Sequence, residues 1–280
     1  ENDAAIEYFY EAENALYASE AFEEIRADFL REHFSTIIIV VVVLLIAWVI
    51  WVSVKRARRR KYGPPKERHN VFTVIRNFFR RITGIMRHPI DGFEGIRYEN
   101  QGSYADMVII MILYALISVV SEYAVSFIYR DGTPLDVIEP VSTFFLAFLP
   151  WIVVCVVNYG VTTIMYGEGR FRDVIIGGAY CHGPLLLLML PINLLTHILT
   201  QNEAGIFRIV NILLYFWTVL LVYFCIKGVH GFHPVKAFVV SILTVLGVAA
   251  VAILFFIVYG LAAQMFDFII QFGKELSYLV

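Results

Sequence analysis

The chain has 280 residues, of which 59% are hydrophobic and 16% are charged, and its mean hydropathy is +0.72. Soluble domains have about 45–50% apolar and about 25% charged residues. This composition therefore excludes an ordinary soluble domain and predicts an all-α, polytopic integral membrane protein. The net charge of −2 conceals a strong separation of acidic and basic residues along the chain.

The segment 1–34 is acidic, with ten acidic and two basic side chains, and its apolar residues recur at approximately helical spacing. We expect a helical segment outside the cytoplasm, broken into two short helices near Ser19. A solvated amphipathic helix that leads into the membrane is the favoured interpretation. The alternative is the end of a larger helical-repeat domain resembling a tetratricopeptide array, which would need further repeats upstream.

Residues 35–54 are almost continuously apolar and predict a first transmembrane helix, because about 20 residues cross the hydrocarbon core. Six Lys and Arg residues follow within 55–61. Because short basic segments remain on the cytoplasmic side of a membrane, we expect 55–83 to be a basic cytoplasmic linker. No recognition module accompanies the basic run, so nucleic acid is not an expected partner.

The second half of this linker predicts an amphipathic helix. From Asn70 onward, apolar residues recur on one side and arginines lie mainly on the other. Such a helix lies on the inner membrane surface, against anionic lipid, or docks a cytoplasmic partner. The candidate contact residues are Arg76, Phe78, Phe79 and Arg80, together with Arg170 and Arg172 from a later loop.

Five further apolar segments predict a five-span membrane domain over 84–265. The expected spans are 104–128, 142–166, 174–199, 207–227 and 237–259. With both termini outside, 17 of the 22 Lys and Arg residues are cytoplasmic, so the charge asymmetry favours this orientation in a cell membrane. Residues 266–280 are expected to form an outer amphipathic tail, either on the membrane surface or as an extension of the last span.

The segment 166–191 combines a charged, glycine-broken loop with an apolar stretch that glycines and prolines interrupt. Glycine lets helices approach closely in lipid, and proline inside a helix usually bends it. We therefore expect a loop that leads into a bent span packed tightly on its neighbours. The residues that carry this expectation are Gly177, Gly178, Tyr180, Pro184 and Pro191.

These residues also carry a family resemblance. The charged loop followed by an aromatic residue and Gly-x-Ala-Tyr-Cys-x-x-Pro-Leu-Leu over 177–186 resembles the signature of the Yip family. This family comprises the Ypt/Rab-interacting multispanning membrane proteins and their bacterial relatives. The segment His88-Pro-Ile-Asp-Gly-Phe-Glu-Gly-Ile resembles the entry to the same domain, and the resemblance covers about 84–265.

The resemblance implies a non-enzymatic protein that acts through other membrane proteins. In eukaryotic relatives these partners are Rab GTPases and vesicle-trafficking factors. The extra N-terminal span and the long basic linker look more like the bacterial relatives, which often occur beside genes for sugar ABC importers. The resemblance therefore favours an accessory or scaffold subunit of a carbohydrate ABC-type importer, with permease subunits as partners.

Polar residues inside the predicted spans are candidates for function or for hydrogen bonds between helices. They are Glu122, Asn158, His182, Asn193 and Arg208. An ion pair between Glu122 and Arg208 is one possibility. If these residues lined a water-filled path, the chain would be a stand-alone channel or carrier, and a trafficking adapter that binds a small GTPase is a third alternative.

No catalytic or metal-binding constellation is evident. The three cysteines lie in apolar runs without zinc spacing, and His230-Gly-Phe-His233 lacks further ligands. The Tyr-Gly-Glu-Gly loop lacks the ending and the preceding strand of a phosphate loop. We therefore expect no enzyme activity and no cofactor.

Overall fold

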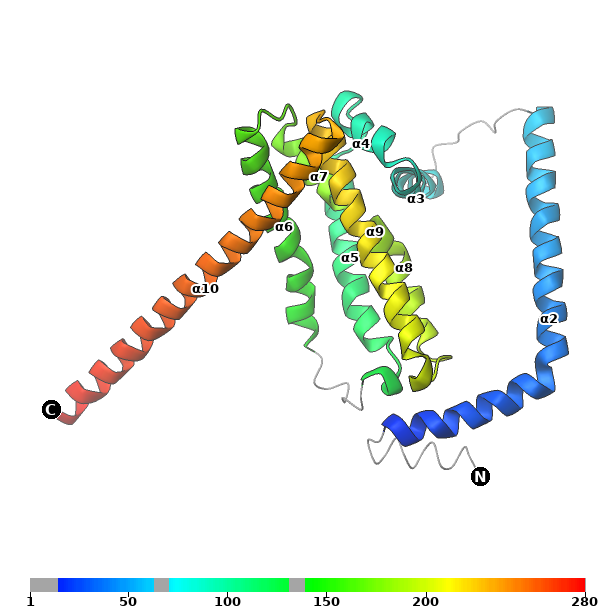
Figure 1. Cartoon of the computed structure of the whole chain (residues 1–280), viewed down its shortest axis with the longest axis horizontal. Helices are drawn as coiled ribbons and strands as arrows, with labels where there is room; N and C mark the ends of the chain where they lie inside the picture. The colour runs from blue at the N-terminus through cyan, green and yellow to red at the C-terminus, as the bar shows by residue number, and fades with distance from the viewer. Residues whose placement is uncertain (1–14, 63–70, 131–138, 280) are drawn as a thin grey trace. The chain divides into compact units, whose positions relative to one another are not determined.

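The computed structural model describes residues 15–62, 71–130 and 139–279, with some stretches of α2, α3 and α10 described by their backbone alone. All described regular structure is helical (Figure 1), which confirms the all-α prediction. The elements are α2 (Ala15–Tyr62), α3 (Val71–Arg87), α4 (Pro89–Tyr98), α5 (Tyr104–Tyr123), η1 (Phe127–Arg130), α6 (Pro140–Ile164), α7 (Phe171–Tyr180), α8 (Gly183–Leu195), η3 (Gln201–Glu203), α9 (Ala204–His230) and α10 (Pro234–Leu279).

Five helical segments of the described chain are long and apolar enough to cross a membrane. They are Tyr104–Tyr123, Pro140–Ile164, Phe171–Leu195, Gln201–His230 and Pro234–Ile270. The protein is therefore a polytopic membrane protein, and the five spans predicted after residue 100 are confirmed. The earlier predicted span, 35–54, lies within α2, where most side chains fall outside the described residues, so its crossing of the membrane stays a prediction.

The third of these spans consists of two helices, α7 and α8, separated by Cys181 and His182. Pro184 has no N–H, so it cannot donate to the carbonyl four residues back. The preceding residues close the turn, because the His182 N–H donates to the Ala179 carbonyl oxygen at 3.1 Å. The interruption thus lies where the glycines and proline predict a change in helix direction.

The chain divides into two compact units, and α3, α5, α6, α8 and α9 contribute residues to both. In the first unit, the start of α2 is held by polar contacts. Arg26 forms an ion pair with Glu203 at 2.6 Å, and the Gln201 N–H donates to the Ser19 hydroxyl at 2.8 Å. The expected helix break near Ser19 is wrong, because this residue lies inside α2, where its side chain is used in docking.

Further hydrogen bonds in this first unit join the end of α5 and the segment after it to the end of α8 and the segment before α9. The Asn193 amide donates to the Ser121 carbonyl at 3.0 Å, and the Ser126 N–H donates to the Thr196 hydroxyl at 2.8 Å. Tyr129 donates to the Thr200 carbonyl at 2.8 Å. The topology prediction places the start of α2, the segment after α5 and the segment before α9 on the same side of the membrane. The structure brings these three segments into contact.

In the second unit, α6 packs against α10. The Asn158 amide donates to the Thr244 hydroxyl at 3.0 Å, and both residues are buried. A Cβ on Gly247 would lie 2.6 Å from Val157 Cγ1, so the glycine allows this close approach. Beyond this contact α10 continues without interruption to Leu279, so the predicted tail is an extension of the last span rather than a separate helix.

The predicted topology can be tested at one exposed position in the loop after α6 and at another in the first turn of α9. Tyr166 is 89% exposed, and nothing lies within 4 Å of a Cβ built on Gly205. In intact cells, Gly205→Cys should react with a membrane-impermeant maleimide, whereas Tyr166→Cys should react only after permeabilisation. The parent chain, whose three cysteines are buried, is the control. The reverse labelling pattern would show the opposite orientation.

Candidate functional site

The loop between α6 and α7 closes around the imidazole of His230, at the C-terminus of α9. A Cβ on Gly167 or Gly169 would lie 2.7 or 2.8 Å from His230 Nδ1, and the Gly169 N–H donates to that nitrogen at 3.3 Å. His230 is 2% exposed, and its ring stacks on Phe232. The two loop glycines therefore leave the space that the histidine occupies.

This arrangement fixes the hydrogen-bonding role of each ring nitrogen. Since Nδ1 accepts a hydrogen bond, the neutral ring carries its proton on Nε2. His230 Nε2 is buried without a partner among the described residues, as is Nη1 of Arg97. Both groups are donors, and buried donors without a protein partner are commonly satisfied by an ordered water.

Arg97 connects α4 to this loop. Its Nη2 forms an ion pair with Glu168. Its Nη1 lies 2.6 Å from the position that a Cβ on Gly231 would take, and Gly231 has φ of +66°. Gly231 is thus required both for the left-handed backbone conformation and for the approach of the guanidinium group.

Asp173 lies in the first turn of α7, where a helix N-terminus favours negative charge. Its side chain is 1% exposed and lies 3.2 Å from Arg170 Nε and 3.4 Å from Arg172 Nη1. Arg172 also donates to Asn100 Oδ1 at 3.0 Å and to the Gly102 carbonyl at 2.7 Å. Arg172 therefore fixes the segment before α5, whereas Arg170 remains 66% exposed.

Glycines also position α4 against α7 and α9. Phe93 is fully buried, and a Cβ on Gly228 would lie 2.9 Å from its Cβ. A Cβ on Gly177 would lie 2.6 Å from Cys225 Sγ and 3.7 Å from Phe93 Cδ1. The segments 88–96 and 166–180, far apart in sequence, thus form one packed site.

A family comparison matches this part of the chain: the Yip1 domain model covers residues 83–257. The chain belongs to the Yip1 domain family. The match includes both segments of the packed site and agrees with the resemblance seen over about 84–265. Neither the curated proteins nor the solved structures contain a match to the chain.

The structure brings together only part of the predicted packing set of the Yip1 domain. Gly177, Gly178 and Tyr180 belong to α7, and the Tyr180 hydroxyl donates to Asp106 Oδ2 at 3.3 Å. Gly178 faces α6, since a Cβ there would lie 2.7 Å from Cys155 Sγ. Pro184 and Pro191 lie in α8.

The predicted polar residues of the spans do not gather at one place. Glu122 accepts a hydrogen bond from Thr143 at 2.9 Å. Among the described residues no ion pair joins Glu122 to Arg208, whose side chain is exposed. His182 Nδ1 donates to the Gly178 carbonyl at 3.0 Å. Asn158 and Asn193 make the contacts between helices given above. On α3, Arg76, Phe79 and Arg80 are exposed and Phe78 is half-buried.

Sequence reasoning missed the central residues of the site, Arg97, Glu168, Gly169 and His230. The only local signals were the Gly-x-Gly spacing and a histidine at the end of an apolar helix. The structure argues against a metal site formed by His230 and His233, because His230 is buried against Phe232 whereas His233 is exposed. The described residues include no cluster of three or more side chains suited to hold a metal.

The closure of the loop around His230 can be tested with Gly169→Ala. The new Cβ would lie 2.7 Å from Val229 Cγ1 and 2.8 Å from the Val229 carbonyl oxygen. Overpacking of this kind costs about 1–3 kcal/mol, so the melting temperature in detergent should fall by at least about 3 °C. Gly160→Ala, with nothing within 4 Å of the new Cβ, is the control and should melt no lower than the parent. Equal melting temperatures for both variants would contradict the described closure.

Proposed function

We propose that this Yip1-family protein is a non-enzymatic accessory or scaffold subunit that acts by binding other integral membrane proteins. The observation that supports the proposal most strongly is the length and exposure of α10. This helix has 46 residues, which corresponds to about 69 Å at 1.5 Å per residue. The hydrocarbon core of a bilayer is about 30 Å thick.

Beyond its contact with α6, the described side chains of α10 are largely exposed. Residues 249–270 are all exposed except Gly260 and Ala262, which are intermediate. Lipid can cover only about 20 residues of a helix that crosses upright. Apolar side chains near the end of this stretch, such as Leu261, Met265 and Ile269, are 54–61% exposed. Large exposed apolar surfaces mark interaction sites, and we infer that a helix of a partner membrane protein packs here.

The proposed partners are the permease subunits of an ABC-type carbohydrate importer. The resemblance to bacterial members, with an extra N-terminal span and a basic linker, supports this choice over a trafficking role. Permease subunits are themselves helical membrane proteins, so they can bury the apolar side of α10 through helix–helix packing.

Glutamates on the apolar face of α10 test this proposal. Met265→Glu with Ile269→Glu should abolish co-purification of permease subunits from native membranes, measured by quantitative mass spectrometry, because a charge would be buried in the interface. Gln264→Glu adds a charge to the neighbouring polar face and should retain the partners. Unchanged recovery with the double variant would place the interface elsewhere.

A second measurement addresses the alternative of a stand-alone carrier. The purified protein, reconstituted alone in liposomes, should show no sugar or ion flux above that of empty vesicles. Robust flux from the protein alone would overturn the subunit proposal.

We also propose that α3 contacts anionic lipid. Arg76 and Arg80 are exposed on this helix, beside the exposed apolar side chains of Ile75 and Phe79. A basic residue near an anionic membrane surface contributes about 1 kcal/mol of attraction.

Replacing both arginines with glutamine should lower the anionic lipid retained after purification by at least about threefold, since each contact removed weakens binding. Native mass spectrometry with phosphatidylglycerol gives the measurement. Arg31→Gln, at an exposed arginine of α2, is the control and should retain the lipid. Equal retention in all three proteins would contradict the lipid contact.

A further inference from the structure

His230, at the C-terminus of α9, is a buried titratable group that has no part in the proposed function. Its side chain is 2% exposed, and its ring stacks on Phe232. Nδ1 accepts a hydrogen bond from the Gly169 N–H at 3.3 Å. A Cβ on Gly167 would also lie 2.7 Å from this nitrogen. The lone pair of a neutral histidine therefore holds the loop between α6 and α7 against α9.

Protonation of this histidine removes the contact. A proton on Nδ1 turns the acceptor into a donor, which then faces a second donor, the Gly169 N–H. The Thr162 carbonyl oxygen lies on the same side of the loop, but it already accepts from the Gly167 N–H at 2.7 Å. The closed loop therefore fits the neutral ring and not the charged one.

The charges of α4 and α7 beside the ring are unequally balanced. Arg97 acts on the ring with a like charge, and Asp173 acts on it with an opposite charge. Asp173 already pairs with Arg170 and Arg172. Nη1 of Arg97, in contrast, is buried without a partner among the described residues. A protonated ring would thus add a positive charge beside a guanidinium group in a poorly solvated place.

The loop, α9 and α10 also carry charged residues near the histidine. Glu168 of the loop pairs with Nη2 of Arg97, and this carboxylate side chain is 73% exposed. Lys227 lies three residues earlier on α9, which places it on the same side of the helix. Lys236 of α10 lies over the aromatic ring on which the histidine stacks, with its Nζ 4.5 Å from the ring centroid. These two lysines also oppose a positive charge on the histidine.

We propose that the loop over 165–170 responds to pH: it is closed on neutral His230 and opens when acidification protonates this residue. Opening breaks the ion pair between Glu168 and Arg97. It also uncovers Phe232, because a Cβ on Gly167 would lie 3.0 Å from the edge of that ring. Acidification thereby changes the surface that the second unit presents at this end of its spans.

The size of the effect follows from proton linkage. An exposed histidine has a pKa of about 6.5, so the open loop binds a proton that the closed loop excludes. The closed form is thus fully stable above this pKa and loses stability as the pH falls below it. The ratio of open to closed molecules should rise about tenfold between about pH 7.5 and about pH 5.5.

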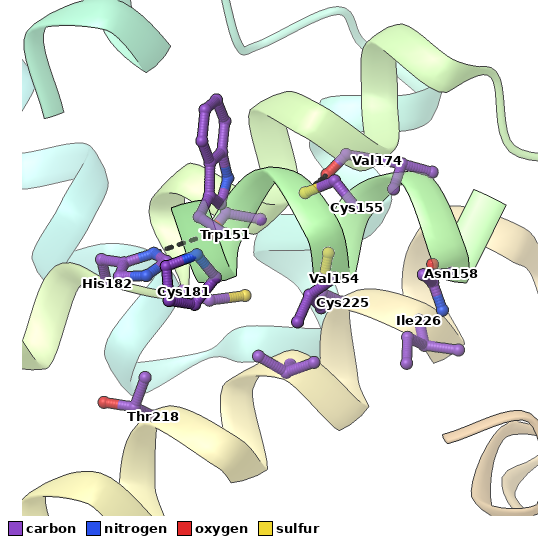
Figure 2. Close-up of a pocket in the computed structure, with 13 residues that line it drawn as sticks. Trp151, Val154, Cys155, Asn158, Val174, Cys181, His182, Thr218, Cys225 and Ile226 are labelled. Atoms are coloured by element: carbon purple, nitrogen blue, oxygen red, sulfur yellow. Dashed lines mark hydrogen bonds between the residues drawn. The ribbon is translucent and has the colours of Figure 1, made fainter. Parts of the chain in front are cut away.

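His182, which is half-buried in the same unit, offers a comparison. It lines a cavity of about 140 Å³ among α6, α7 and α9, together with Trp151 and all three cysteines of the chain (Figure 2). Its Nδ1 donates to the Gly178 carbonyl oxygen at 3.0 Å. A proton added to Nε2 leaves this hydrogen bond in place. Of these two histidines, only His230 loses its hydrogen bond on protonation.

The test is amide hydrogen exchange of the full-length protein in detergent, measured by mass spectrometry at about pH 7.5 and about pH 5.5 and corrected for the intrinsic effect of pH. Peptides that cover 165–170 report on the loop. Peptides within α8 (Gly183–Leu195), which has no Asp, Glu, His, Lys or Arg, are the internal reference. Opening of the loop relative to α8 should rise about tenfold on acidification.

Two matched variants assign the effect to one histidine. His230→Gln retains an oxygen that accepts from the Gly169 N–H but does not titrate, so the dependence on pH should disappear. His233→Gln replaces an exposed histidine nearby and should retain the full increase. Glu168→Gln removes the loop carboxylate and should also retain it.

Equal opening of the loop at both pH values in the parent protein would overturn the proposal. An equal rise in α8 would overturn it as well, because the whole unit would then be loosening. An effect that persists in His230→Gln, or one that is lost in Glu168→Gln, would assign the response to a carboxylate instead. If His230→Gln does not fold, the parent protein and Glu168→Gln still decide the question.

Discussion

The close approach of α7 to three neighbouring helices is the constraint on which the second unit depends. Gly177 and Gly178 are adjacent, so they point in different directions around the helix. One allows contact with α9 and α4, and the other allows contact with α6. Because apolar attraction between helices is weak in lipid, close van der Waals contact of this kind is a principal source of stability there. The candidate site and the cavity both depend on these glycines, since Phe93 lies beyond the first and Trp151 beyond the second.

Polar contacts complete this packing at the ends of the helices. A backbone or side-chain polar group that enters hydrocarbon must be paired within the protein. The loop around His230 meets this requirement with glycine backbone, and Asp173 meets it by pairing with two arginines at the start of α7. In the first unit, Arg26 and Glu203 serve a similar purpose, but both are partly exposed. Their pairing therefore contributes more to the position of α2 than to stability.

The sequence allowed the helices to be predicted but not most of the site. Span positions follow from continuous apolar composition, and the interruption after Tyr180 follows from a proline that lacks an N–H. The pairing of Arg97 with Glu168 joins residues 71 positions apart, and no local pattern encodes such a contact. The docking of Ser19 on Gln201 was missed for the same reason, and the small polar residue was misread as a helix break. The convergence of three cysteines on one cavity likewise depends on helix packing rather than on spacing.

The distribution of buried residues separates the roles of the helices. Six of the ten residues of α7 are buried, so almost any change in this helix alters packing within the protein. Among the described side chains of α10, the buried ones lie in the first part, at Ala237, Val240 and Thr244, and most residues of 249–270 are exposed. A helix that served only to anchor the domain could end where the bilayer ends. The additional apolar turns of α10 cost conformational entropy and solubility unless something covers them, which is the physical reason to seek the function of this protein in its contacts with other membrane proteins.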